Sequence, residues 1–177
     1  AGWEAAGGTS TGETYVKLKD RNGNASNTGD NTYAGYQAGN SLSSGGNENA
    51  FYGNAAGKAV TSGSSNIALG HDALVSNTTG AENVAIGAFA LESVTTADGN
   101  IAIGYEALQE NTSGTTNVAI GNLALTTITS GSSCVAIGDS ALKVNTNSGN
   151  TAVGASALMA NTIGGYQVAV GFEALKA

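Results

Sequence analysis

Few side chains in this chain of 177 residues could perform acid–base or nucleophilic chemistry. The single histidine, His71, precedes Asp72, and a nucleophile–base pair would require a hydroxyl held within hydrogen-bonding reach of the imidazole. Serine and threonine occur throughout the chain, so their nearness to His71 in sequence carries no information. Cys134, the single cysteine, has no evident cationic neighbour that would lower its pKa. We expect a surface histidine, a buried inert thiol and no catalytic site.

Metal and phosphate sites have equally little support. Residues 20–24 (Asp-Arg-Asn-Gly-Asn) resemble the start of a calcium loop, but Asn31 stands where the twelfth-position glutamate belongs. A hairpin turn is therefore the better interpretation of this segment. The glycines within residues 34–39 lack the strand-then-helix setting that a phosphate loop needs. We expect no cofactor and no bound metal.

Acidic and aromatic side chains recur shortly after regularly spaced glycines. The carboxylates predict a solvated stripe: Asp72, Glu106, Asp139 and Glu173. A glycan-cleaving enzyme would need a converging pair of carboxylates, and the sequence supplies no repeated pair. The aromatic residues are candidate glycan contacts, although their amphipathic character favours packing between neighbouring segments: Tyr36, Phe89, Tyr105 and Phe172.

Composition and charge exclude several functional classes. The chain has 27 glycines, no proline and a formal net charge of −7, which would repel nucleic acid. No stretch approaches the roughly 20 apolar residues of a membrane-spanning helix, so we expect no membrane insertion in this segment. Hydrophobic residues make up 41% of the chain and recur at fixed places, which indicates an ordered repeat rather than disorder.

Nine copies of one unit of about 17 residues, each called a rung here, provide that order. The rungs begin at Asn31, Asn49, Asn66, Asn83, Asn100, Asn117, Cys134, Asn150 and Gln167. Glycine closes the first five residues of every rung: Gly35, Gly53, Gly70, Gly87, Gly104, Gly121, Gly138, Gly154 and Gly171. Alanine follows three residues later in all nine, from Ala38 to Ala174. Such regularity defines a repeat domain over residues 31–177.

The residue types of one rung predict an all-β, parallel β-solenoid (β-roll). Residues 84–86 (Val-Ala-Ile) form a short β-branched segment bounded by asparagine and glycine, which is typical of a strand. Val84 and Ile86 would share one face and Ala85 the other. Ala90 and Leu91 would point to opposite sides if extended, with a helical turn as the alternative. Stacking at about 4.8 Å per rung gives a body roughly 40 Å long.

Stacked rungs place like residues over like, and two sets of positions follow from this. The asparagines that begin the rungs should form an amide ladder: Asn31, Asn49, Asn66, Asn83, Asn100, Asn117 and Asn150. The repeated glycine should either take a positive φ or lie where a neighbouring backbone leaves no space for a Cβ. The sequons at residues 77–79 and 111–113 are attributed to chance in a chain rich in asparagine and threonine.

The beginning of the chain departs from the repeat. Tyr33 and Phe51 replace the strand alanine, and Gly39 and Gly57 replace the leucine, which predicts compensating packing. Residues 1–30 form a separate segment, in which an alternating stretch and an Asn-Gly turn predict a strand or hairpin that caps or connects the first rung.

Both faces of the predicted strand are apolar, which indicates assembly. A thin solenoid buries about 1.5–3 kcal/mol per aliphatic side chain, against about 1–2 kcal/mol of backbone entropy per residue. The second apolar face, with small alanine at its centre, favours chains packed around a shared axis. A homotrimer is the expected closure.

The rung sequence, as in residues 83–91 and 150–158, resembles the head repeats of trimeric autotransporter adhesins and similar repeats in bacteriophage tail fibres. The resemblance covers about residues 31–177. It implies a trimeric β-roll on a bacterial cell surface or phage virion that acts as spacer and attachment surface, with a host-surface glycan or protein as receptor. The rungs here are longer than those of adhesin heads, and no neck or coiled coil is visible. An extracellular filament joined head to tail is the alternative assembly.

Overall fold

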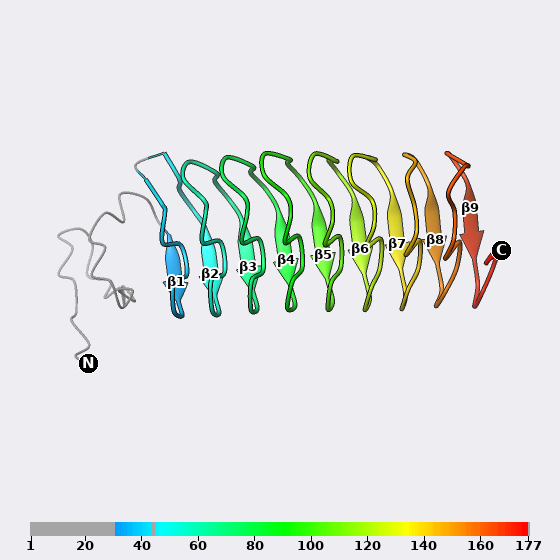
Figure 1. The fold of residues 1–177 in the computed structure, drawn as a ribbon, viewed down its shortest axis with the longest axis horizontal. Helices are drawn as coiled ribbons and strands as arrows, with labels where there is room; N and C mark the ends of the chain where they lie inside the picture. The colour runs from blue at the N-terminus through cyan, green and yellow to red at the C-terminus, as the bar shows by residue number, and fades with distance from the viewer. Residues whose placement is uncertain (1–30, 44, 177) are drawn as a thin grey trace, which may run out of the picture.

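The computed structural model describes residues 31–43 and 45–176, and this part of the chain is a parallel β-solenoid (Figure 1). Each rung contributes one three-residue strand to a single sheet, in the order β1 to β9. The strands are β1 Thr32–Ala34, β2 Ala50–Tyr52, β3 Ile67–Leu69, β4 Val84–Ile86, β5 Ile101–Ile103, β6 Val118–Ile120, β7 Val135–Ile137, β8 Thr151–Val153 and β9 Val168–Val170. The described residues contain no helix. The predicted fold class is therefore confirmed.

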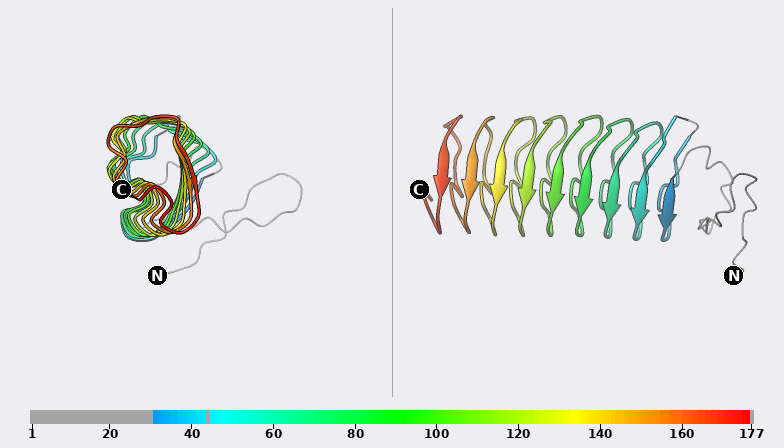
Figure 2. Two further views of the ribbon diagram at one scale, coloured as in Figure 1. Left: turned by 90° about the vertical axis from the view of Figure 1, so that its right-hand side faces the viewer. Right: turned by 180° about the vertical axis from the view of Figure 1, so that it is seen from behind.

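Successive rungs stack over one another with a gradual displacement from one end to the other, as the view along the long axis shows (Figure 2). Val84 pairs with Ile101, and Ala85 pairs with Ala102, so like residues are in register. The pairing stays in this register across every neighbouring pair, including the rung that has only 16 residues. A parallel register with no offset makes columns of equivalent side chains along the rod.

The alternation predicted within each strand is confirmed. Ala85 has no exposed surface, whereas Val84 and Ile86 on either side of it are partly exposed. The middle residue therefore faces the interior, and the two β-branched residues face outward. The same pattern occurs in all nine strands.

The segment after the glycine is neither extended nor helical, so the extended form predicted for Ala90 and Leu91 is wrong. Both side chains are fully buried. Phe89 and Leu91 have φ of 60° and 51°, in the left-handed region, so the chain curls inward at every second residue. The amide of Phe89 donates to the His71 carbonyl one rung back, and that of Leu91 to the Ala107 carbonyl one rung ahead. These bonds between rungs hold the unusual backbone.

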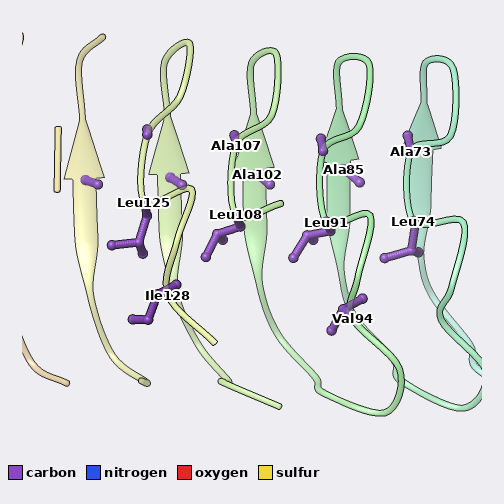
Figure 3. Packing of buried hydrophobic residues seen from close by; sticks show 14 of the residues in the cluster. Ala73, Leu74, Ala85, Leu91, Val94, Ala102, Ala107, Leu108, Leu125 and Ile128 are labelled. Carbon is purple, nitrogen blue, oxygen red and sulfur yellow. The ribbon is translucent and has the colours of Figure 1, made fainter. Parts of the chain in front are cut away.

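The interior is filled by columns of small and medium side chains (Figure 3). One column holds the strand alanines, a second the alanines after the glycine, and a third the leucines. Leu74, Leu91, Leu108 and Leu125 are all fully buried. This leaves an interior wide enough for one layer of side chains.

The first two rungs pack differently, as predicted. Phe51 is fully buried, and a Cβ added to Gly57 would lie 2.7 Å from three atoms of its ring. A Cβ added to Gly39 would lie 3.2 Å from the same ring and 3.6 Å from Tyr33. The aromatic rings therefore occupy the volume that leucine fills in later rungs.

The glycine that ends each of the strands β1 to β8 satisfies both conditions proposed for it. Gly104 has φ of 141°, and a Cβ built on it would lie 2.3 Å from the Gly121 carbonyl oxygen. No L-residue fits such an approach between rungs. The predicted N-terminal segment, residues 1–30, lies outside the described residues. In the described part of the chain, no helix is long and apolar enough to cross a membrane.

Candidate functional site: buried ladders and two outer surfaces

A buried asparagine ladder fixes the start of each strand. The backbone N–H of Asn83 donates to the side-chain oxygen of Asn66 at 3.0 Å, and the backbone N–H of Asn100 donates to the side-chain oxygen of Asn83 at 3.0 Å. The Asn83 side-chain nitrogen donates to the carbonyl of Ala97, near the end of the same rung, at 2.8 Å. Each asparagine thus satisfies two backbone groups that no strand pairs. The ladder is a structural element of the rod and exposes no reactive group.

A second set of buried asparagines escaped the sequence analysis. The Asn77 side chain accepts from the Gly80 amide at 3.0 Å and donates to the Gly80 carbonyl at 2.9 Å. Asn111 makes the same pair of bonds with Gly114. These residues are the asparagines of the sequons at residues 77–79 and 111–113, and both are fully buried. The signal that would have found them is an alternation with a period of 34 residues over rungs 2 to 7, in which Val60, Val94 and Ile128 alternate with asparagine at this position.

Cys134 occupies a ladder position but makes only some of the hydrogen bonds that asparagine makes at the other ladder positions. Its amide donates to the Asn117 side chain at 2.9 Å, and its Sγ lies 3.3 Å from the Asn147 carbonyl oxygen. The side chain is fully buried, and burial raises the pKa of the Cys134 thiol. A neutral, inaccessible thiol agrees with the expectation of an unreactive cysteine.

The first of two outer surfaces is the outward side of the sheet, here called the outer sheet face. It consists of the first and third residues of each strand: Thr32, Ala34, Ala50, Tyr52, Ile67, Leu69, Val84, Ile86, Ile101, Ile103, Val118, Ile120, Val135, Ile137, Thr151, Val153, Val168 and Val170. None carries a charge. Ile67 and Leu69 are 43% and 48% exposed, although both are large and aliphatic. The expectation that small alanines form the outer apolar face is wrong, because the strand alanines face the chain's own interior.

The second surface is a row of rings and carboxylates across rungs 3, 4 and 5, here called the aromatic row: His71, Asp72, Phe89, Tyr105 and Glu106. The centroid of the Phe89 ring lies 5.2 Å from that of His71 and 6.0 Å from that of Tyr105, in edge-to-face arrangements. His71 Nδ1 lies 3.3 Å from an Asp72 carboxylate oxygen. A hydrogen bond to Glu106, followed by its negative charge, raises the pKa of the Tyr105 hydroxyl.

The structure separates the other predicted candidates from this row. Tyr36 and Phe172 occupy the same column as His71 and Tyr105, but they lie in the first and last rungs. Asp139 also lies in this column, whereas Glu173 lies in the adjacent column with Asp72 and Glu106. The proposed stripe of carboxylates is therefore spread over two columns. Among residues 31–43 and 45–176, no cluster of three or more His, Cys, Asp or Glu side chains could hold a metal ion.

No protein-family model, curated protein or solved structure matches this chain. Its function is therefore inferred from the geometry of the two outer surfaces.

Proposed function

We propose that this chain is a structural and adhesive segment of a trimeric extracellular fibre, in which the outer sheet faces of three chains meet at a shared axis. The observation that carries the proposal is the outer sheet face itself. It presents two continuous columns of uncharged, mostly β-branched side chains, and several of them are more than a third exposed. Contiguous apolar surfaces of this kind mark interaction sites in soluble proteins.

The two-column layout of the outer sheet face, rather than its area, favours three chains over two. Nine rungs span roughly 40 Å, and a three-residue strand with its side chains is roughly 10 Å wide, so each chain offers on the order of 400 Å². Two chains would bury on the order of 800 Å² in one contact, and three would bury on the order of 1,200 Å² divided over three contacts, so buried area alone does not separate the two assemblies. Two columns per chain also suit two neighbours, since the first-position column meets one chain and the third-position column meets the other.

A rod of this design supports the role of spacer and attachment surface on a bacterial cell or a phage virion. Its length grows by about 4.8 Å with each added rung, without any change in cross-section. Three chains also present every surface position three times. Weak individual contacts with a receptor then gain strength through simultaneous engagement.

The test measures the mass of the assembly and its response to charge on the outer sheet face. Wild-type protein at micromolar concentration should show three times the chain mass of 17.3 kDa in size-exclusion chromatography with light scattering. Ile86→Asp, near the middle of the face, should shift the protein to monomer because it would bury an unpaired charge. Thr79→Asp places the same charge on an exposed turn away from the sheet and should leave the trimer intact.

A monomeric wild-type protein would contradict the proposed trimer. A trimer that Ile86→Asp leaves unchanged would contradict its assembly through the outer sheet face. Electron microscopy separates the alternative assembly. Short rods of uniform length support the fibre segment, whereas filaments of indefinite length support head-to-tail stacking.

A further inference from the structure

The aromatic row combines exposed rings with carboxylates in a way that the stability of the rod does not require. The His71 side chain is 51% exposed and Tyr105 is 48% exposed, while Phe89 between them is half-buried. We propose that the aromatic row binds an uncharged sugar residue of a glycan. This inference adds a ligand class to the attachment role, and it depends on the solenoid but not on the trimer.

The rings supply the apolar half of a sugar site. A pyranose ring presents C–H groups on its faces, and aromatic side chains offer large, rigid apolar surfaces to such groups. Phe89 is nearly perpendicular to both neighbours, at interplanar angles of 73° to His71 and 88° to Tyr105. Edge-to-face contacts hold each ring in place while leaving much of the two outer rings open to solvent. The platform is therefore ordered before a ligand arrives, which reduces the entropic cost of binding.

The carboxylates supply the polar half and determine the charge of the ligand. Asp72 and Glu106 are acceptors when ionised, and sugar hydroxyls are donors. Asp72 is already held by His71 Nδ1 at 3.3 Å, and Glu106 lies close enough to Tyr105 to raise the pKa of its hydroxyl. The row contains no lysine or arginine, so sialylated, sulfated and phosphorylated glycans would be repelled. An uncharged sugar with several hydroxyls fits this arrangement.

A two-rung alternation along the rod sets the spacing of the rings. In the column directly after the glycine, odd-numbered rungs carry Tyr36, His71, Tyr105, Asp139 and Phe172, whereas even-numbered rungs carry Asn54, Ala88, Asn122 and Ala155. Four of the five odd positions hold rings, and all four even positions hold small side chains. Rings in every rung would stack on one another at about 4.8 Å and hide their faces, whereas rings at about 9.6 Å do not. Only in the aromatic row does the intervening rung add a third ring, Phe89, in the adjacent column.

The test is a binding measurement with neutral tetrasaccharides of glucose, galactose, mannose or N-acetylglucosamine, by titration calorimetry and saturation-transfer NMR. At least one of them should bind wild-type protein. Tyr105→Ala should weaken that binding about tenfold, the equivalent of one aromatic contact of about 1.4 kcal/mol. Glu106→Gln should weaken it too, because an ionised acceptor makes the stronger hydrogen bond. Tyr36→Ala is the matched control, since it removes an exposed ring of the same column outside the row, and it should change affinity less than twofold.

Three results would overturn the proposal: no neutral tetrasaccharide binds, Tyr36→Ala weakens binding as much as Tyr105→Ala, or choline or sialyllactose binds more tightly than every neutral sugar. Thermal unfolding of the variants shows whether a loss of binding reflects loss of the fold. All five residues of the row lie in three consecutive rungs of one chain. Sugar binding therefore stays measurable if the protein is monomeric, and failure of the trimer is distinguishable from failure of this site.

Discussion

A large side chain at Phe51 accompanies the absence of one at Gly57, and this predicts that substitutions at the two positions have strongly coupled effects on the free energy of unfolding. Phe51 stands where later rungs have the strand alanine, and Gly57 stands where they have leucine. Phe51→Ala alone removes a fully buried ring, which costs about 3–5 kcal/mol in a core that cannot collapse. Gly57→Leu alone places a Cβ 2.7 Å from the Phe51 ring, below any real contact distance, and should cost about 3 kcal/mol or more.

The double variant rebuilds the packing of the later rungs and should be far more stable than the sum predicts. Gly57 has φ of 58°, close to the 51° that Leu91 adopts, so leucine at position 57 needs no new backbone. Its side chain can then fill the volume that the ring leaves. Gly39 also faces the Phe51 ring, so a small cavity remains and recovery should be incomplete. We expect a coupling energy of about 2–3 kcal/mol in favour of the double variant.

Urea unfolding followed by far-UV circular dichroism measures the three free energies, provided that the m-value stays constant among the variants. Phe51→Ala combined with Leu125→Ala, which is several rungs away, is the control and should be additive within about 0.5 kcal/mol. Additivity of the changes at positions 51 and 57 within that same error would refute the compensating exchange.

Other positions give sharp expectations as well. Gly104→Ala should destabilise the rod by about 3 kcal/mol or more, because the Gly121 carbonyl leaves no space for a Cβ. Gly171 meets no backbone of a following rung, so Gly171→Ala should cost only the backbone strain of about 1–2 kcal/mol. Urea unfolding measures both free energies. Asn83→Ala should cost about 2–4 kcal/mol by the same assay, since the Asn100 amide and the Ala97 carbonyl lose their partners. Because burial raises the pKa of the Cys134 thiol, the stability that the neutral thiol contributes should be complete below about pH 8.5 and should be lost as the pH rises through the folded pKa. The melting temperature of the wild-type protein should therefore fall over this pH range, and that of Cys134→Ala should lack this component of the fall. Expression in a glycosylating host should leave the sequons at residues 77–79 and 111–113 unmodified in peptide mapping by mass spectrometry, because both asparagines are buried.

The architecture was predictable because the repeat determines it. Identical short strands bounded by glycine and asparagine leave one economical arrangement, in which each rung pairs with the next in register. The compensation between Phe51 and Gly57 was visible for the same reason, since a departure from a repeat has a defined reference. Positions that recur in every rung therefore carried most of the information.

The backbone after the glycine could not be predicted from residue types. Leucine and phenylalanine rarely adopt a positive φ, yet Leu91 and Phe89 do so here. Their conformation is imposed by hydrogen bonds to the neighbouring rungs, which only the assembled stack provides. The inward direction of the strand alanine was equally hidden, because hydrophobicity alone places the larger Val84 and Ile86 inside. The interior has space for a leucine opposite an alanine, and bulkier strand residues must face outward.

The contrast between the exposed columns indicates how the rod divides its tasks. The third-position column of the outer sheet face stays apolar in all nine rungs, although the structure leaves much of it exposed and nothing within one chain requires this. The two columns after the glycine change from rung to rung among rings, acids, amides and small residues. Exposed positions that remain apolar in every rung are explained by a partner that also repeats along the axis, as another copy of this chain does. Exposed positions that vary suit a ligand met at particular places along the rod, and the aromatic row is the place where rings and carboxylates gather. Charge on the outer sheet face should therefore change assembly without affecting sugar binding, and changes in the aromatic row should do the reverse.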